Sequence, residues 1–292
     1  MTSKYDTKVD LNSNSSHTQI VNLVGHGKRV LDVGAATGYL AEVLVGRGCL
    51  VTGIELDPDA ARQAERYCDR VIVGDLETMD LNAEIGEDRF DVIVFGDVLE
   101  HLKDPQSVLS RFGAFLGPAG YAVASIPNIA HASVRLALLQ GEFRYRSLGL
   151  LDNTHLKFFT RETVEQLFEE AGFLIYDLRR TIQGVFDTEI EVDRDAVTED
   201  LLRQVQQDPE ALTYQFVLKV YPLGESATRA IYEDLLLELT RKLRHFEPVE
   251  RRLNIRTRQL AEREEEVGRL TQEVIDLKDR LARLVQSGKG DI

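Results

Sequence analysis

The sequence predicts an α/β fold, in which a mostly parallel sheet carries helices on both faces and a long helix follows toward the C-terminus. Three observations predict it. Between residues 29 and 126, short apolar segments alternate with segments of helical periodicity. Acidic residues end four successive apolar segments, and an apolar heptad repeat begins near residue 232. Short apolar strands that alternate with helices indicate parallel strands joined by right-handed crossovers.

The alternating part follows a short expected helix over residues 17–24. Apolar runs predict strands at 29–33, 50–55, 70–73, 90–95 and 120–126. The spacing of apolar residues between these runs predicts helices at 39–47, 58–67 and 105–116. Pro58 and Pro105 stand at helix starts, where a missing N–H is tolerated. An antiparallel α+β domain would instead show hairpin turns and polar strand faces, and the sequence has neither before residue 173.

The pattern changes after residue 126. Residues 129–140 have helical spacing, and 141–159 form an irregular stretch rich in aromatic and basic residues. A helix is expected over 160–171, with Thr160 as its N-cap and Thr163 where a capping box usually has Glu. The last two expected strands, 173–181 and 214–221, are separated by an acidic insertion.

A heptad repeat predicts a coiled coil over residues 224–287, followed by a short tail over 288–292. All eight a positions are apolar, namely Tyr232, Leu239, Phe246, Leu253, Leu260, Val267, Val274 and Leu281. Five of the eight d positions are also apolar, which favours association with another helix. Pro248 predicts a kink. We therefore expect a homo-oligomer; the alternative is a helix that folds back onto the preceding domain.

Composition excludes several classes of function. The formal net charge is −14, and residues 223–292 contain 14 basic and 14 acidic residues, so the acidic excess lies before them. A large nucleic-acid footprint would need a basic face, so no nucleic-acid partner is expected. No apolar run is long enough to span a membrane, and residues 1–16 are polar. Cys49 and Cys68 lack metal-ligand spacing, which favours reduced packing residues in a cytoplasmic protein.

The first expected strand ends in a glycine turn, Asp32-Val33-Gly34-Ala35-Ala36-Thr37-Gly38. Ala36 stands where the dinucleotide fingerprint has its second glycine, so a dehydrogenase is not favoured. No Lys-Ser/Thr follows, which excludes a P-loop. A carboxylate at Asp32 would repel a pyrophosphate but attract a cation such as an amino group or a sulfonium.

Four acids follow the ends of successive strands: Asp32, Glu55, Asp75 and Asp97. The carboxyl ends of parallel strands share one edge of the sheet, where ligands of open α/β sheets bind. Glu55 can accept hydrogen bonds from both ribose hydroxyls, and Asp75 from an adenine amino group. Each acid alone could be a solvated residue at a strand end, but core packing does not explain four in succession.

These segments resemble the successive motifs of class I S-adenosylmethionine (SAM)-dependent methyltransferases. The resemblance covers roughly residues 29–127 and rests on the glycine turn, Gly53-Ile54-Glu55-Leu56-Asp57, Gly74-Asp75-Leu76-Glu77 and the segment 90–102. It implies a Rossmann-like, seven-stranded sheet closed by an antiparallel pair, with SAM as cofactor and S-adenosyl-L-homocysteine as product. The implied cofactor residues are Asp32, Gly34, Ala35, Gly38, Glu55, Leu56, Asp75, Leu76, Asp97, Val98 and His17.

A narrower resemblance covers residues 125–173, with Ser125-Ile126-Pro127-Asn128, Gly141-Glu142-Phe143-Arg144-Tyr145 and Asp152-Asn153-Thr154-His155 as its motifs. It resembles bacterial methyltransferases linked to glycosyltransferases and surface-polysaccharide synthesis, and also the ubiquinone-methyltransferase-like group. The expected acceptor is a sugar or glycan, with the coiled coil a candidate for docking to glycosyltransferases. The alternatives are a small-molecule or quinone-precursor acceptor, and a scaffold that binds SAM weakly.

The resemblance divides the chain into an N-terminal segment with a cap helix (1–24), a methyltransferase domain (25–223) and the coiled coil. The domain would include an acceptor lid (129–160) and an insertion (186–212). A hydroxyl acceptor benefits from a general base. The candidate catalytic residues are His131, favoured as base, then His155 and Asp97, while His101 fits a pocket wall; each histidine could equally be structural.

No resident metal is expected from the sequence. Asp97 and Glu100 with a histidine could hold a divalent metal that orients the acceptor, but no compact ligand cluster supports this. The basic residues Arg135, Arg144 and Arg146 near the lid are candidates to bind a phosphate or carboxylate of the acceptor. Simple solvation explains exposed arginines equally well.

Overall fold

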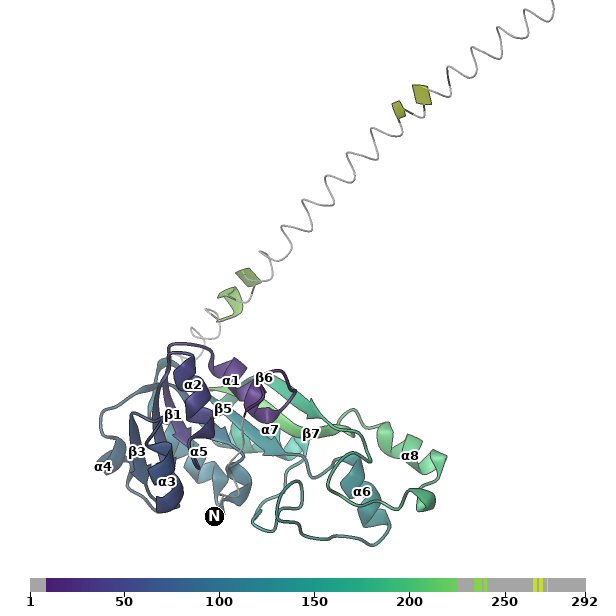
Figure 1. Ribbon diagram of the computed structural model, residues 1–292, viewed down its shortest axis with the longest axis horizontal. Helices are drawn as coiled ribbons and strands as arrows, with labels where there is room; N and C mark the ends of the chain where they lie inside the picture. The colour runs from purple at the N-terminus through teal and green to yellow at the C-terminus, as the bar shows by residue number, and fades with distance from the viewer. Residues whose placement is uncertain are drawn as a thin grey trace, which may run out of the picture. The chain divides into compact units, whose positions relative to one another are not determined.

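The computed structural model describes residues 9–224 and, beyond them, 234–237, 239–240, 265–266, 268–269 and 272. The chain divides into two compact units, Met1–Ile231 and Tyr232–Ile292, each described here by itself (Figure 1). In the second unit, the described residues are helical. The rest of the predicted coiled coil over 224–287 lies outside the described residues, so the coiled coil stays a prediction. No described helix is long and apolar enough to cross a membrane.

The first unit contains a seven-stranded sheet of order β3-β2-β1-β4-β5-β7-β6, in which β7 alone runs opposite to the other six strands. The strands are β1 (Arg29–Val33), β2 (Leu50–Glu55), β3 (Arg70–Val73), β4 (Phe90–Gly96), β5 (Leu116–Pro127), β6 (Phe173–Ile182) and β7 (Thr213–Pro222). The predicted Rossmann-like sheet with an antiparallel closing pair is confirmed.

The helices are α1 (Ser16–Val24), α2 (Tyr39–Gly46), α3 (Pro58–Ala64), α4 (Leu81–Ile85), α5 (Pro105–Gly113), α6 (Ala132–Leu139), α7 (Arg161–Glu170) and α8 (Glu199–Gln206), with 3-10 turns at Leu99–His101 and Arg194–Ala196. Thr160 caps α7, and Thr163 completes the capping box with its own hydroxyl. Sequence analysis missed α4, a single turn, and α8, which lies in the acidic insertion. Only one residue of α8, Val205, is buried, so its apolar pattern is short.

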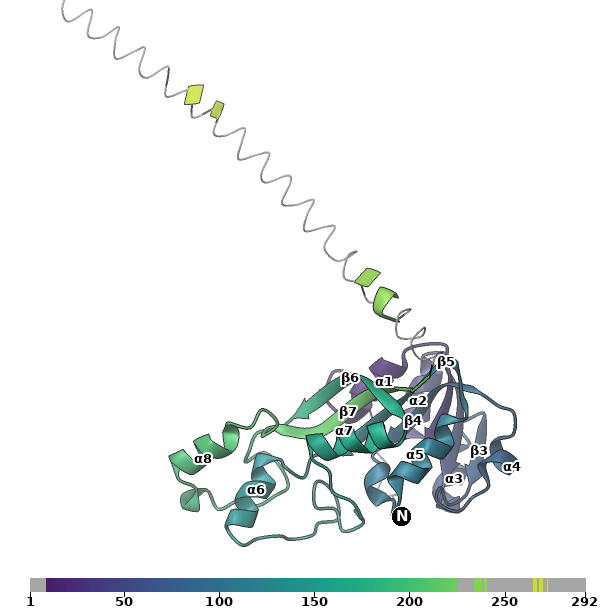
Figure 2. The same cartoon turned by 180° about the vertical axis from the view of Figure 1, so that it is seen from behind.

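Alternate residues of each strand enter different cores, because successive side chains of a strand point to opposite faces. Leu31 and Phe95 pack on the face covered by α5 and α7, while Val30 and Val94 pack beneath α1 and α2. The two helical layers are seen from opposite sides in Figures 1 and 2. These layers hide both faces of the parallel strands and leave the carboxyl edge as the place for a ligand.

The predicted lid and insertion pack on each other and form what we call the lid subdomain, residues 128–159 and 183–212. Two apolar clusters hold it together, one made of Ala132, Leu136, Val185, Val205 and Ala211, the other of Val134, Ala137, Leu150, Leu151 and Ile190. In both ribbon views α6 and α8 lie side by side, away from α3 and α4 (Figures 1 and 2). The insertion therefore supports the lid.

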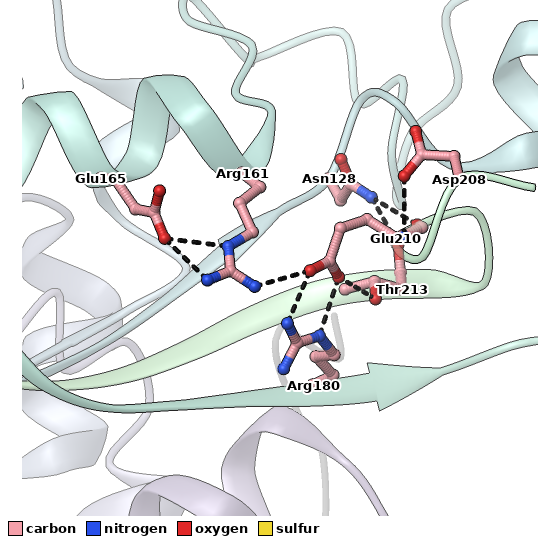
Figure 3. A network of polar contacts seen from close by, with 7 residues as sticks. All are labelled: Asn128, Arg161, Glu165, Arg180, Asp208, Glu210 and Thr213. Carbon is pink, nitrogen blue, oxygen red and sulfur yellow. Dashed lines mark hydrogen bonds and ion pairs between the residues drawn. The ribbon is translucent and has the colours of Figure 1, made fainter.

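A buried carboxylate, Glu210, ties the lid subdomain to the sheet (Figure 3). It accepts hydrogen bonds from Arg161 (2.9 Å), Arg180 (2.6 and 2.8 Å) and the Thr213 hydroxyl (2.7 Å). The Asn128 amide donates to the carbonyls of Glu210 (3.2 Å) and Thr213 (2.8 Å). The network thus joins the start of α7, strand β6, the start of β7 and the segment that follows β5.

The Glu210 network predicts an acid-sensitive contribution to stability. Hydrogen bonds, first from Arg180, lower the pKa of Glu210 to about 2 against the opposing effect of burial. A carboxyl whose pKa is lowered by folding stabilises the folded state at every pH above its unfolded pKa of about 4.3. This stabilisation, about 3 kcal/mol for Glu210, is lost as the pH falls from about 4.3 toward about 2. The free energy of unfolding, measured by urea titration against pH, should show this loss in the wild type and not in Glu210→Gln. Glu165→Gln, which removes a more exposed partner of Arg161, is the matched control. Parallel curves for wild type and Glu210→Gln would contradict the prediction.

Candidate active site

The strand order reverses between β1 and β4, which lie side by side in the middle of the sheet. Their carboxyl ends are in register, with Val33 opposite Phe95. A crevice opens at such a point because the connections from the two strands leave in opposite directions, and ligands of open α/β sheets bind there. The glycine turn follows β1, and Asp97 follows β4, so both border this crevice.

The glycine turn requires glycine at two positions. Gly34 has φ +79°, and a Cβ there would lie 2.5 Å from Cγ2 of Val98. Gly38 has φ +82°, and its Cβ would lie 2.8 Å from Cα of Ala64. Positive φ strains other residues, and these approaches leave no room for a side chain. Val98, expected at the cofactor site, therefore packs directly against the turn.

Asp32 and Glu55 place two carboxyl groups beside this turn. Asp32 is 3% exposed, and its Oδ2 has no hydrogen-bond partner among the described residues. Burial, with a smaller contribution from the Glu55 charge, raises the pKa of Asp32 to about 7. Glu55 accepts backbone hydrogen bonds from Ala36 (2.7 Å) and Asp57 (2.9 Å), which fix its carboxylate at the end of β2. A buried carboxyl that lacks a partner suits a cationic ligand.

The residues expected at the adenine end lie at the ends of β2 and β3. Leu56 is 67% exposed directly after Glu55. Asp75 is exposed, and one carboxylate oxygen accepts from the Glu77 N–H (2.9 Å), while Leu76 packs against the core. An exposed apolar side chain next to polar acceptors suits the flat ring of a nucleoside.

Asp97 joins the end of β4 to the N-terminal helix. Its φ is +55°, and Oδ1 accepts hydrogen bonds from Ser125 Oγ (2.6 Å) and Gln215 Nε2 (2.8 Å). Its Oδ2 lies 4.0 Å from Nε2 of His17, and that nitrogen lies 3.2 Å from the Tyr39 hydroxyl. The structure therefore brings together Asp97 and His17. The contacts of Ser125 and Gln215 with Asp97 were not predicted; each is a polar residue inside an apolar strand, and Ser125 also opens a motif of the narrower resemblance.

His131 lies after β5 as the N-cap of α6, the position that its place in the sequence suggested. The residue is fully buried, and Nδ1 accepts a hydrogen bond from the backbone N–H of Ser133 (3.2 Å) at the start of α6. Its Nε2 lies 3.2 Å from the Gln183 carbonyl, to which it can donate. Burial lowers the pKa of His131. Both ring nitrogens are engaged in capping α6 and binding the insertion, so we do not propose His131 as the base.

His155 instead packs against His101, with ring centroids 4.8 Å apart. The backbone positions the pair: His101 Nδ1 lies 3.2 Å from the Thr154 carbonyl, and the N–H groups of Leu156 (2.8 Å) and Lys157 (3.0 Å) donate to the Glu100 carbonyl. Burial, then the neighbouring His101, lower the pKa of His155. A lowered pKa favours the neutral imidazole, which is the form that can accept a proton.

Glu100 completes this histidine cluster, which we define as Glu100, His101 and His155. The Glu100 side chain is 1% exposed, and neither carboxylate oxygen has a hydrogen-bond partner within residues 9–224 or the other described positions. Burial, then the charge of Asp97, raise its pKa well above the usual range. One ligand atom from each of the three residues lies within 4.8 Å of the other two. The cluster could share a proton or hold a divalent cation.

A row of aromatic side chains extends from the histidine cluster across the lid. His155 lies 6.1 Å from Phe158, Phe158 lies 6.3 Å from Phe143, and Phe143 lies 5.5 Å from Tyr145, measured between ring centroids. Phe143 and Tyr145 are 41% and 58% exposed. This aromatic row, Phe158, Phe143 and Tyr145, offers flat apolar surface to a molecule that reaches His155.

Comparison with known proteins identifies the family of the chain. Residues 17–178 match the family model described as a methyltransferase domain. The chain belongs to this methyltransferase family.

It is 28% identical over 169 residues to a ubiquinone biosynthesis O-methyltransferase of Psychrobacter arcticus, covering 56% of the chain and 66% of that protein. It is 30% identical over 149 residues to the protein of that name from Thiobacillus denitrificans, covering 50% and 64%. The chain thus spans about two thirds of the length of these curated relatives.

A solved structure supports the fold alone. A SAM-dependent methyltransferase from Archaeoglobus fulgidus superposes with a TM-score of 0.50 at 19% identity, covering 70% of this chain and 94% of that one. The shared architecture agrees with the seven-stranded sheet described above.

The cofactor of this methyltransferase is SAM, and the residues at the crevice fit it. The buried Oδ2 of Asp32 lacks a hydrogen-bond partner among the described residues, and Gly34 lets the turn pack tightly against Val98 beside it. When bound, SAM supplies a methyl group on a positively charged sulfur. Asp32 would face the cationic methionine part, Glu55 the ribose hydroxyls, and Asp75 with Leu56 and Leu76 the adenine.

The raised pKa of Asp32 predicts pH-dependent cofactor affinity. A cation prefers the ionised carboxylate, and the fraction of ionised Asp32 falls as pH drops below about 7. The SAM affinity, measured by isothermal titration, should therefore weaken by about 50-fold between pH 7 and pH 5. In Asp32→Asn the affinity should be lower at pH 7.5 and nearly independent of pH. A wild-type affinity that stays constant over this range would count against a role for Asp32.

Proposed function

We propose that this methyltransferase transfers the methyl group of SAM to a hydroxyl of a small aromatic acceptor of the quinone-precursor type. The observation that carries the proposal is the histidine cluster at the end of the aromatic row, beside the cofactor crevice. The curated relatives are ubiquinone biosynthesis O-methyltransferases, and this similarity supports the same chemistry. An aromatic acceptor would lie against Phe158 and Phe143 with its hydroxyl toward His155.

Proton removal is the step for which the chain supplies a residue. A phenolic hydroxyl has a pKa of about 10, so it is mostly protonated and weakly nucleophilic at neutral pH. Neutral His155 can take that proton while the acceptor oxygen bonds to the methyl carbon and the carbon–sulfur bond breaks. The backbone carbonyl of Glu100 and the ring of His101 position the His155 imidazole, and the acceptor oxygen would have to lie in line with the methyl carbon and the sulfur.

A sugar or glycan acceptor is the second candidate. It rests on the narrower sequence resemblance, as does the proposed link to polysaccharide synthesis and glycosyltransferases. An alcohol on saturated carbon is much less acidic than a phenol, and the aromatic row favours a flat ring. Methyl transfer from radiolabelled SAM to catechol and to methyl glucoside separates the two. Transfer to catechol is expected; transfer to the glycoside alone would favour the sugar acceptor.

A divalent cation is the other candidate occupant of the histidine cluster. The buried, unpartnered Glu100 carboxylate favours it, since such a group needs a proton or a cation. Activity after dialysis against EDTA, with and without added Mg²⁺, tests this role. Activity that is lost on dialysis and restored by Mg²⁺ would assign a cation to the histidine cluster. Unchanged activity would mean that Glu100 carries a proton instead.

We also propose that the heptad repeat over residues 224–287 pairs with a second copy of the chain. Its a positions are apolar throughout, and this pattern is the support for the proposal. Analytical ultracentrifugation should show an oligomer at full length and a monomer when the chain ends at Gly224. A monomer at full length would contradict pairing.

A further inference from the structure

A cavity of about 330 Å³ lies within the lid subdomain, apart from the cofactor crevice. It is open to solvent and bordered by the end of α6, the lid segment 142–151 and residues 190–193 of the insertion. Its apolar lining consists of Ala137, Leu151, Ile190 and Val192. None of the expected cofactor residues and no member of the histidine cluster lines it. The volume falls at the lower end of the range typical of small-molecule sites.

Polar groups of both charges line the rest of the cavity. Arg144 forms a two-point ion pair with Glu142 (2.6 and 2.8 Å), and Arg146 pairs with Glu191 (3.0 Å). Gln140 exchanges two hydrogen bonds with the backbone of Asp193, donating to its carbonyl (2.8 Å) and accepting from its N–H (3.0 Å). The lining thus combines fixed donors and acceptors across the junction of lid and insertion.

This composition selects a class of ligand. Glu142, Glu191 and Asp193 give three carboxylates against two guanidinium groups, so a phosphate or carboxylate would meet net negative charge. A hydroxyl group can donate a hydrogen bond to a carboxylate and accept one from a guanidinium, so a ligand with several hydroxyls can bind both kinds of group. Arg146 pairs with Glu191 through one terminal nitrogen, and its partly exposed guanidinium offers further N–H groups to a ligand oxygen. The apolar lining residues suit the C–H groups on the face of a sugar ring.

We propose that this cavity binds a neutral polyhydroxylated ligand, a single sugar ring, with Arg146 and Gln140 among its hydrogen-bond partners. Residues 142, 144 and 146 line the cavity, and the residues between them, Phe143 and Tyr145, belong to the aromatic row. A bound sugar would therefore steady a lid segment whose alternate residues face the acceptor. The site is additional to the proposed methyl transfer and does not depend on it.

The test measures sugar binding directly, without SAM or acceptor. Saturation-transfer NMR on the full-length chain would be run with the methyl glycosides of glucose, galactose and rhamnose, and inorganic phosphate would serve as the anion probe. At least one glycoside should bind, and more tightly than phosphate. Arg146→Leu should weaken that binding by about tenfold or more, because it removes charged donors. Glu142→Gln, which keeps the size of a rim side chain, should weaken it less.

Arg203→Leu is the matched control, because Arg203 forms a comparable exposed pair with Asp200 on α8, away from the cavity lining. This variant should bind the glycoside like the wild type. Three outcomes would overturn the proposal: no glycoside binds, phosphate binds more tightly than every glycoside, or Arg146→Leu and Arg203→Leu retain equal affinity. Thermal unfolding of each variant identifies a folding defect, and if Arg146→Leu is unfolded then Gln140→Leu takes its place with the same expected loss.

Discussion

Replacing His155 with glutamine should lower kcat for methyl transfer to a phenolic acceptor by about 100-fold or more, the usual contribution of a positioned base. The SAM affinity should change little, because His155 borders the acceptor side of the crevice. Burial and the neighbouring His101 lower the pKa of His155, which keeps the ring ready to accept a proton. Steady-state kinetics with catechol, together with SAM titration, measure both effects.

The control for this substitution is His131→Asn. Asparagine is a good N-cap, so this variant can retain the hydrogen bond to the N–H of Ser133 that starts α6. Its kcat should remain within a few-fold of wild type after correction for the folded fraction. A large loss of kcat in folded His131→Asn, with wild-type turnover in His155→Gln, would reverse our assignment of the base.

Gly34→Ala should strongly weaken SAM binding. The substitution strains a backbone at φ +79° and drives a methyl group to 2.5 Å from Val98 Cγ2, so the turn or Val98 must move. Backbone strain alone costs about 1–3 kcal/mol, and displacing the cofactor-facing turn adds to it, so we expect a loss of affinity of about 100-fold or more. Isothermal titration with SAM measures the loss.

Gly25→Ala is the control that separates strain from crowding. Gly25 has a similar φ of +84°, but a Cβ there meets nothing within 4 Å. It should lower the free energy of unfolding modestly and leave SAM affinity unchanged. Equal losses of affinity in the two variants would mean that general destabilisation, rather than the shape of the turn, explains the effect of Gly34→Ala.

The sheet and its acidic edge were predictable because they depend on local pattern. Apolar runs of four to seven residues mark the parallel strands, and the structure places β1, β2 and β3 at their predicted bounds. Once the strands are parallel, their carboxyl ends must share an edge, so Asp32, Glu55 and Asp97 could be placed there from sequence alone. The predicted start of β5 was wrong: the strand begins at Leu116 rather than at residue 120, within a segment that contains glycine and proline.

The identity of the proposed base could not be read from the sequence, because it depends on contacts between distant segments. The ring of His131 contacts the Gln183 carbonyl, 52 residues away. The ring of His101 contacts the Thr154 carbonyl, 53 residues away, and this places His155 beside His101. The same limit applies to the arginines of the lid. Arg135 pairs with Asp208, and Arg146 with Glu191, both from an insertion that gave no sign of packing on the lid.

The measurement that tests the central claim most directly is transfer of a radiolabelled methyl group from SAM to catechol by the full-length wild-type protein, with methyl glucoside in a parallel assay. The proposal predicts an O-methylated phenol formed in proportion to S-adenosyl-L-homocysteine, with little transfer to the glycoside. SAM binding without transfer to catechol, or transfer to the glycoside alone, would contradict it.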